Sequence, residues 1–124
     1  MIKFVIEVAP RTKKNSQQII KVKGKPIIIP SKLYKQYEKD CKPFIPNIET
    51  INYPINLKCI YYMPTKRKVD LNNLLEATTD MLVYYKVLED DNSKIVFSHD
   101  GSRVRYDKKM PRTEIFINRI EGND

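Results

Sequence analysis

The pattern of apolar and polar residues predicts a series of short strands. Four segments carry the alternation or the short apolar run of a half-buried strand: residues 2–9, 54–63, 93–99 and 113–120. In the second of these segments the residues expected to face inward are Ile55, Leu57, Cys59 and Tyr61. Residues 19–22 and 27–29 flank Lys23-Gly24-Lys25-Pro26, which predicts a hairpin with a glycine turn.

Two further segments have helical spacing. Ser31 is a suitable N-cap, and the helix that it begins has an apolar stripe of Leu33, Tyr34, Tyr37 and Cys41. Asp70 precedes a second helix that ends near Tyr85, with a stripe of Leu71, Leu74, Leu75, Thr78, Leu82 and Tyr85. A long basic turn is expected at residues 101–112. These elements predict one α+β domain over residues 1–124, with a mixed sheet of four to five strands and the two helices packed on one face.

The composition fits a folded protein that does not span a membrane. Hydrophobic residues make up 41% of the 124 residues and glycine occurs only 3 times, which excludes an intrinsically disordered chain. No apolar stretch approaches the ~18 residues of a membrane span, and the N-terminal region lacks the long apolar run of a secretion signal. Cys41 and Cys59 have no metal-site spacing and are expected to be reduced thiols.

The charge is unevenly distributed. The net charge is +8, yet residues 1–69 hold 15 Lys and Arg against 4 Asp and Glu, whereas residues 70–100 hold 2 against 7. The basic part suits a polyanion, and clustered carboxylates repel the same polyanion unless a divalent cation lies between them. On charge alone, a metal site and a set of helix caps and solvated acids are equally good interpretations.

The acidic residues fall into two groups. Asn72, Glu76 and Asp80 lie four residues apart and therefore on one side of the second predicted helix, with Asp70 at its start. Glu89-Asp90-Asp91 follows about twenty residues after Asp70, just before a strand. Three converging carboxylates suit Mg²⁺. Asp70 is equally a good N-cap, and the later run is equally an ordinary solvated turn.

Three segments together resemble the RusA-type Holliday-junction resolvases. They are Lys68-Val69-Asp70-Leu71-Asn72-Asn73-Leu74-Leu75, then residues 87–96 with Asp90-Asp91, and Pro10-Arg11-Thr12-Lys13-Lys14-Asn15 after the first strand. The resemblance implies a phage or prophage endonuclease of DNA recombination and repair, active in the bacterial cytoplasm without a membrane or a small-molecule cofactor. It further implies a homodimer that binds four-way DNA junctions and nicks two opposing strands with Mg²⁺, for which Mn²⁺ substitutes.

The resemblance also assigns residues. Asp70 and Asp91 match metal-site positions of the family, and Asp90 matches the first acid of the later pair. The chain departs from the family at Asn72, where an Asp is usual, and at Glu76, where a Lys is common. The expected metal ligands are Asp70, Asn72, Asp90 and Asp91, and the expected catalytic set is Asp70, Asn72, Glu76 and Asp91. Glu76 lies one turn beyond Asn72, so it is a candidate to restore the missing carboxylate.

Basic residues near these motifs are candidates for holding DNA. The expected contacts are Lys13, Lys14, Asn15, Lys66, Arg67 and Lys68, with a wider footprint at Arg11, Lys21, Lys23 and Lys25. No base-reading motif occurs, which favours recognition of DNA shape. The single histidine, His99, is expected at a strand end rather than in catalysis.

Two other functions remain open on the sequence. A non-catalytic junction- or nucleic-acid-binding module with a degenerate metal site predicts binding without cleavage. A dimeric interaction protein with incidental charge predicts salt-sensitive binding to junction and duplex alike.

Overall fold

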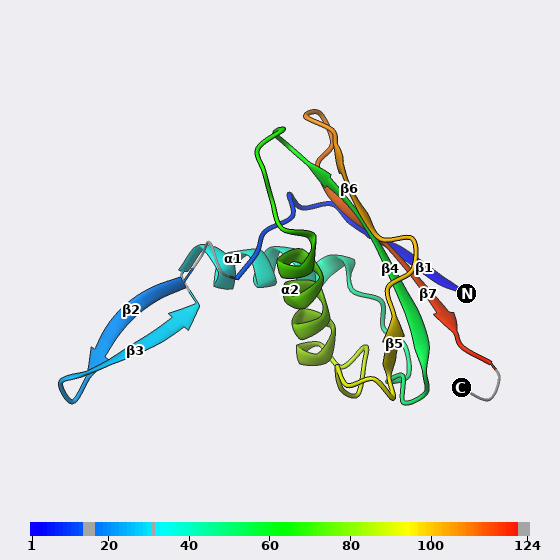
Figure 1. The fold of residues 1–124 in the computed structure, drawn as a ribbon, viewed down its shortest axis with the longest axis horizontal. Helices are drawn as coiled ribbons and strands as arrows, with labels where there is room; N and C mark the ends of the chain where they lie inside the picture. Colours follow the sequence, from blue (N-terminus) through cyan, green and yellow to red (C-terminus); the bar gives the residue numbers. More distant parts are fainter. Residues whose placement is uncertain (14–16, 31, 122–124) are drawn as a thin grey trace.

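The computed structural model describes residues 1–13, 17–30 and 32–121. Lys14, Asn15 and the expected N-cap Ser31 lie outside the described residues. The domain is built on a mixed five-stranded sheet (Figure 1). Its strands are β1 (Ile2–Ile6), β4 (Ile55–Met63), β5 (Val96–Ser98), β6 (Arg103–Tyr106) and β7 (Arg112–Arg119).

β4 is the strand on which the sheet depends. It pairs antiparallel with β7 and parallel with both β5 and β6, while β1 pairs antiparallel with the far side of β7. The helices α1 (Lys32–Cys41) and α2 (Leu71–Tyr84) lie on one side of this sheet, and a short 3-10 turn, η2 (Lys42–Phe44), follows α1 (Figure 1). The predicted hairpin forms a separate two-stranded sheet of β2 (Gln17–Val22) and β3 (Lys25–Pro30). The predicted α+β class is confirmed.

The core lies between the main sheet and the helices. The four residues predicted to face inward from β4 are buried, all at 0–1% exposure: Ile55, Leu57, Cys59 and Tyr61. Cys41 and Cys59 are buried free thiols, and burial raises the pKa of each to about 12, which keeps both protonated. Leu33 was predicted to join the α1 stripe, but its side chain is 61% exposed, so only Tyr34, Tyr37 and Cys41 face the core.

The chain from β4 through α2 to β5 is a parallel crossover. Asp70 caps α2, and the buried Tyr61 hydroxyl on β4 lies 2.7 Å from the Thr78 hydroxyl on α2. After α2, the Leu82 carbonyl accepts from the amides of Val87 and Leu88, which ends the helix and turns the chain back. Ile51 then pairs with this returning segment. The segment that carries Asp90 and Asp91 therefore runs back beside α2 and not away from it.

The predicted basic turn at residues 101–112 is only partly a turn. Residues 103–106 form β6, which pairs parallel with the outer half of β4. All four of its side chains are exposed, so the segment has no buried face. Its sequence, Arg103-Val104-Arg105-Tyr106, does alternate between basic and apolar residues, a short strand signal that the prediction of a turn overlooked. The expectation of a continuous turn is therefore wrong because backbone pairing, not side-chain burial, forms this strand.

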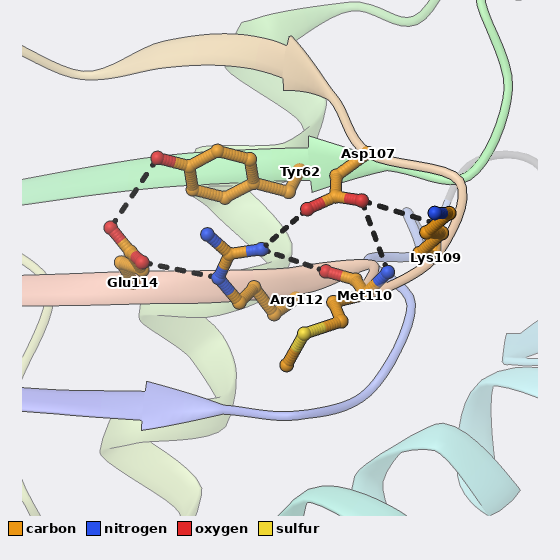
Figure 2. Close-up of polar contacts among 6 residues, drawn as sticks. All are labelled: Tyr62, Asp107, Lys109, Met110, Arg112 and Glu114. Atoms are coloured by element: carbon orange, nitrogen blue, oxygen red, sulfur yellow. Dashed lines mark hydrogen bonds and ion pairs between the residues drawn. The ribbon is translucent and has the colours of Figure 1, made fainter.

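A polar network fastens the connection between β6 and β7 (Figure 2). The Arg112 guanidinium donates to Asp107 at 3.0 Å and to Glu114 at 3.1 Å, and it stacks 3.8 Å from the centre of the Tyr62 ring. Asp107 also accepts the backbone amide of Met110 at 3.1 Å, and this hydrogen bond, with that to Arg112, lowers the Asp107 pKa. These contacts hold the end of β6 against β7 and β4.

Within residues 1–13, 17–30 and 32–121, no helix has the length and apolar character needed to cross a membrane.

Replacing Leu82 with Ala is expected to destabilise the domain by about 3 kcal/mol, because the leucine is fully buried and leaves a cavity. Urea unfolding followed by circular dichroism measures this change. Leu33→Ala is the matched control, and the exposure of Leu33 limits its expected effect to about 0.5 kcal/mol. Equal losses of unfolding free energy in the two variants contradict the burial of Leu82 in the core.

Candidate functional site

A cavity of about 270 Å³ lies between α2 and the returning segment 91–99. Asn72, Glu76 and Asp80 line it from α2 and span roughly 12 Å of the helix. Asp91 and His99 line it from the other side. The remaining lining residues are Leu75, Thr79 and Val96. Three carboxylates, an amide and an imidazole therefore share one concave surface.

A tight turn presents Asp91 to the cavity. The Asp90 carboxylate accepts the Asp91 amide at 2.7 Å and the Asn92 side-chain amide at 3.1 Å. Asn92 in turn accepts the Lys94 amide at 2.9 Å. Asp90 is engaged in these contacts and does not line the cavity. Of the predicted acid pair, Asp90 shapes the turn and Asp91 enters the cavity.

The two carboxyl groups of this pair have opposite pKa shifts. A hydrogen bond with the Asp90 side chain raises the pKa of Asp91, and slight burial and the negative charges of Asp90 and Asp80 raise it further. The backbone amide of Asp91 lowers the pKa of Asp90. The neighbouring Asp90 side chain is therefore the main cause of the raised Asp91 pKa, and the charge of Asp80 in the cavity adds to it. A cation bound beside Asp91 would favour its carboxylate form.

Lys13 joins the N-terminal basic segment to this cavity. Its ammonium lies 2.9 Å from the Asp80 carboxylate, with both side chains about one-third exposed, and 5.5 Å from the centre of the Tyr34 ring. The Tyr34 hydroxyl donates to the Ala77 carbonyl on α2 at 3.2 Å. The predicted DNA contact Lys13 therefore lies beside the acids and partly neutralises them.

Asp70 has a structural role in this arrangement. Its carboxylate accepts the Asn72 amide at 2.9 Å, and its carbonyl accepts the Leu74 amide at 3.2 Å, which begins α2. The side chain is exposed and is not among those that line the cavity. Of the combination Asp70, Glu76 and Asp91, the structure brings Glu76 and Asp91 together and leaves Asp70 at the start of the helix.

His99 contributes the one imidazole of the cavity. It follows β5, as predicted from the sequence, and its Nδ1 lies 2.8 Å from the Leu57 carbonyl. A carbonyl only accepts, so Nδ1 carries the proton, and Nε2 of the neutral ring is the nitrogen that accepts one. Asn56 holds the chain on both sides of His99, through Ser98 and the backbone of Asp100.

The basic loop before α2 meets the N-terminal connector at a second cavity of about 290 Å³. Arg11 lines it from one side, and Arg67 and Lys68 line it from the other. Lys66 is exposed, with its ammonium 5.2 Å from the centre of the Tyr106 ring. Cations from two distant segments thus gather close to the start of α2, a suitable arrangement for phosphate groups.

The donor chemistry of the acidic cavity fits Mg²⁺, but its donors do not converge into a site with three side-chain ligands. Carboxylate and amide oxygens are the ligands that Mg²⁺ takes in proteins. In the part of the chain that the structure describes, no three Asp, Glu, His or Cys side chains lie close enough together to hold a metal ion. An ion held by all three carboxylates therefore requires Glu76, Asp80 or Asp91 to change its side-chain conformation.

The expected ligand and catalytic sets omitted two residues of the cavity, Asp80 and His99. The four-residue spacing had grouped Asp80 with Asn72 and Glu76 on one side of the helix, but those sets gave it no role. The place of His99 could not be predicted, because it depends on the parallel pairing of β5 with β4, which local sequence does not encode.

Replacing Asp91 with Asn is expected to raise the melting temperature at about pH 7. A raised pKa in the folded state means that the Asp91 carboxylate opposes folding when it is charged, and the amide removes this penalty. The gain should shrink as the pH falls towards about 4, because Asp91 in the wild type then becomes protonated.

Differential scanning fluorimetry across this pH range measures the effect. The control Glu89→Gln removes the same charge from an exposed neighbour that lies outside the cavity. A lower melting temperature for Asp91→Asn, or an equal change of melting temperature in the two variants, contradicts an unfavourable charge at Asp91.

Comparison with known proteins does not assign the chain to a family. No protein-family model matches the sequence, and no curated protein matches it significantly. The resemblance described above therefore rests on its three sequence segments alone.

Proposed function

We propose that the protein is a metal-dependent endodeoxyribonuclease that resolves four-way DNA junctions. The observation that carries this proposal is the cavity lined by Glu76, Asp80 and Asp91, with Lys13 directly beside it. Acids at the centre of a basic surface suit cleavage of a phosphodiester, which needs both a cation at the reacting phosphate and anchoring of the flanking phosphates. The motifs that resemble the junction resolvases coincide with this cavity at Asn72 and Asp91.

Glu76, Asp80 and Asp91 are the residues proposed to hold Mg²⁺, or Mn²⁺ in its place. When bound, such an ion lowers the pKa of a water molecule and neutralises charge on the phosphate. Asn72 offers a neutral amide oxygen from the same side of α2. The proposal requires the three carboxylates to draw closer than they lie in the structure, at the expense of the Lys13–Asp80 ion pair.

The remaining groups of the site have roles that follow from their positions. His99 Nε2 is the group proposed to take a proton from the attacking water, since His99 lines the cavity and its Nδ1 is held by the Leu57 carbonyl. Lys13, released from Asp80, is available to a phosphate oxygen. Arg11, Arg67 and Lys68 line the second cavity and hold the DNA backbone on the side nearer the start of α2.

The proposed task suits a homodimer. Two opposing strands of a four-way junction require two sites, which a two-fold axis relates most simply. Junctions arise in recombination and repair, which are the processes proposed for this protein. The resemblance to the junction resolvases is the basis for proposing that it acts in the bacterial cytoplasm and is encoded by a phage or prophage. No small-molecule cofactor is proposed.

A second candidate function is junction or nucleic-acid binding without cleavage. Asn72 lacks the charge of an aspartate, Asp70 is engaged as a helix cap, and no three ligands converge within the described ranges. This candidate predicts that the wild type shifts a junction in a gel and leaves it uncut with Mg²⁺. Cutting restored by Asn72→Asp would then identify a degenerate metal site.

The test of the proposed function is cleavage of a labelled synthetic four-way junction with and without Mg²⁺. The wild type is expected to make paired symmetric nicks only with Mg²⁺. Asp91→Asn and Glu76→Ala are each expected to lose about 100-fold or more in rate, the usual scale for a group that acts in the transition state.

Glu89→Gln is the matched control, since it removes a nearby charge outside the cavity and should cut at the wild-type rate. An unchanged rate in Glu76→Ala contradicts the assignment of Glu76. An unchanged rate in Asp91→Asn, or cutting of linear duplex as fast as of the junction, contradicts the proposed function.

A further inference from the structure

The β2–β3 hairpin stands apart from the rest of the domain. β2 pairs only with β3, and the pair projects from the body near the start of α1 (Figure 1). The buried core draws no side chain from residues 19–28. A two-stranded ribbon with nothing behind it is marginally stable in water. The hairpin therefore has the form of an arm that contacts something outside its own domain.

The positive charge of the arm favours an anionic partner. Lys21, Lys23 and Lys25 are exposed near its tip, and the chain has no Asp or Glu from residue 8 to residue 37. Lys23 and Gly24 form the turn with φ of 52° and 78°, the two-residue type that matches the twist of the strands. Because β2 is six residues long, the turn at its end lies roughly 20 Å from the base of the hairpin.

The exposed apolar residues of the arm indicate that its ligand offers an apolar surface as well as phosphate groups. Ile19 and Ile28 lie directly opposite each other in the register, so they share one face, and they are 71% and 65% exposed. Phosphates offer such side chains no apolar surface. The faces of DNA bases do offer it, and isoleucine is among the residues that wedge between base steps. Bases are stacked within linear duplex and accessible where a junction branches.

We propose that the β2–β3 hairpin is a DNA-reading arm, in which the three lysines hold backbone phosphates and the Ile19–Ile28 pair packs on bases exposed at the branch point. This inference rests on the proposed function for its choice of branched DNA. It divides binding into two parts: the lysines give affinity for any DNA, and the isoleucine pair gives preference for the junction.

A second copy of the chain suits the arm less well. Isologous contact between two hairpins through the isoleucine faces brings two sets of three lysines together, which like-charge repulsion opposes. A polyanion removes this repulsion. Loss of a dimer is therefore included below as an outcome that overturns the proposal.

The experiment measures binding of labelled four-way junction and linear duplex by fluorescence anisotropy in EDTA, over a series of salt concentrations. Ile19→Ser/Ile28→Ser is expected to weaken junction binding about tenfold and to leave duplex binding within about twofold, the scale of one lost base contact. Lys21→Ala/Lys23→Ala/Lys25→Ala is expected to weaken both, and to reduce the slope of log affinity against log salt by about 2 to 3.

Two controls match these variants. Leu33→Ser/Tyr84→Ser removes two equally exposed apolar side chains from the body of the protein, and Lys39→Ala/Lys42→Ala/Lys94→Ala removes three exposed lysines outside the arm. Circular dichroism checks that every variant keeps its secondary structure, and sedimentation velocity gives its oligomeric state. The apolar control is expected to keep the junction preference of the wild type.

Several results overturn the proposal: no junction preference in the wild type, equal effects of the isoleucine variant on both DNAs, or conversion of a dimer to a monomer by that variant. Because the assay contains no Mg²⁺, its outcome is separate from that of cleavage. A wild type that prefers the junction through the isoleucine pair and never cuts it supports the arm while refuting the endonuclease.

Discussion

The contact between Tyr61 on β4 and Thr78 on α2 is the constraint on which the site depends. Their hydroxyls lie 2.7 Å apart in the core, and burial raises the pKa of Tyr61 well above its ordinary value, so the phenol stays protonated and can donate. Together with the other buried residues of α2, this contact sets the rotation of the helix about its axis. With Thr78 towards the sheet, Glu76 and Asp80 lie roughly 160° away around the helix, where they are free of the core.

The parallel crossover then determines what Glu76 and Asp80 face. Because the chain reverses after Leu82 and returns to pair beside β4, Asp91 and His99 are delivered to the same side of α2. The result is an uneven distribution of charge: Lys13 compensates Asp80, whereas Asp91 faces the negative charges of Asp90 and Asp80 with a raised pKa. Carboxylates grouped with perturbed pKa values are typical of functional sites.

The sequence predicted the parts of the fold that bury side chains at a regular interval. The alternation in β4 and the stripe of α2 were correct because burial of each face leaves a periodic trace. β6 was missed although its four residues alternate, because the segment is short and every side chain is exposed. Leu33 was misplaced because it lies roughly 100° around α1 from the buried Tyr34, at the edge of the apolar stripe, where its side chain is exposed. For the site, helical spacing grouped Asn72 with Glu76, whereas the exclusion of Asp70 and the inclusion of His99 depend on tertiary geometry.

The central claim is that the cavity carboxylates of Glu76, Asp80 and Asp91 take the divalent cation needed for cleavage. Mn²⁺ broadens the NMR signals of nearby nuclei, so titration of the ¹⁵N-labelled protein locates a bound ion directly. The account predicts selective broadening, at low Mn²⁺, of the backbone amides of residues 76, 80, 91 and 99, with loss of the effect in Asp91→Asn. Broadening confined to exposed acids such as Asp40 and Glu49, or the same pattern in Asp91→Asn, would contradict it.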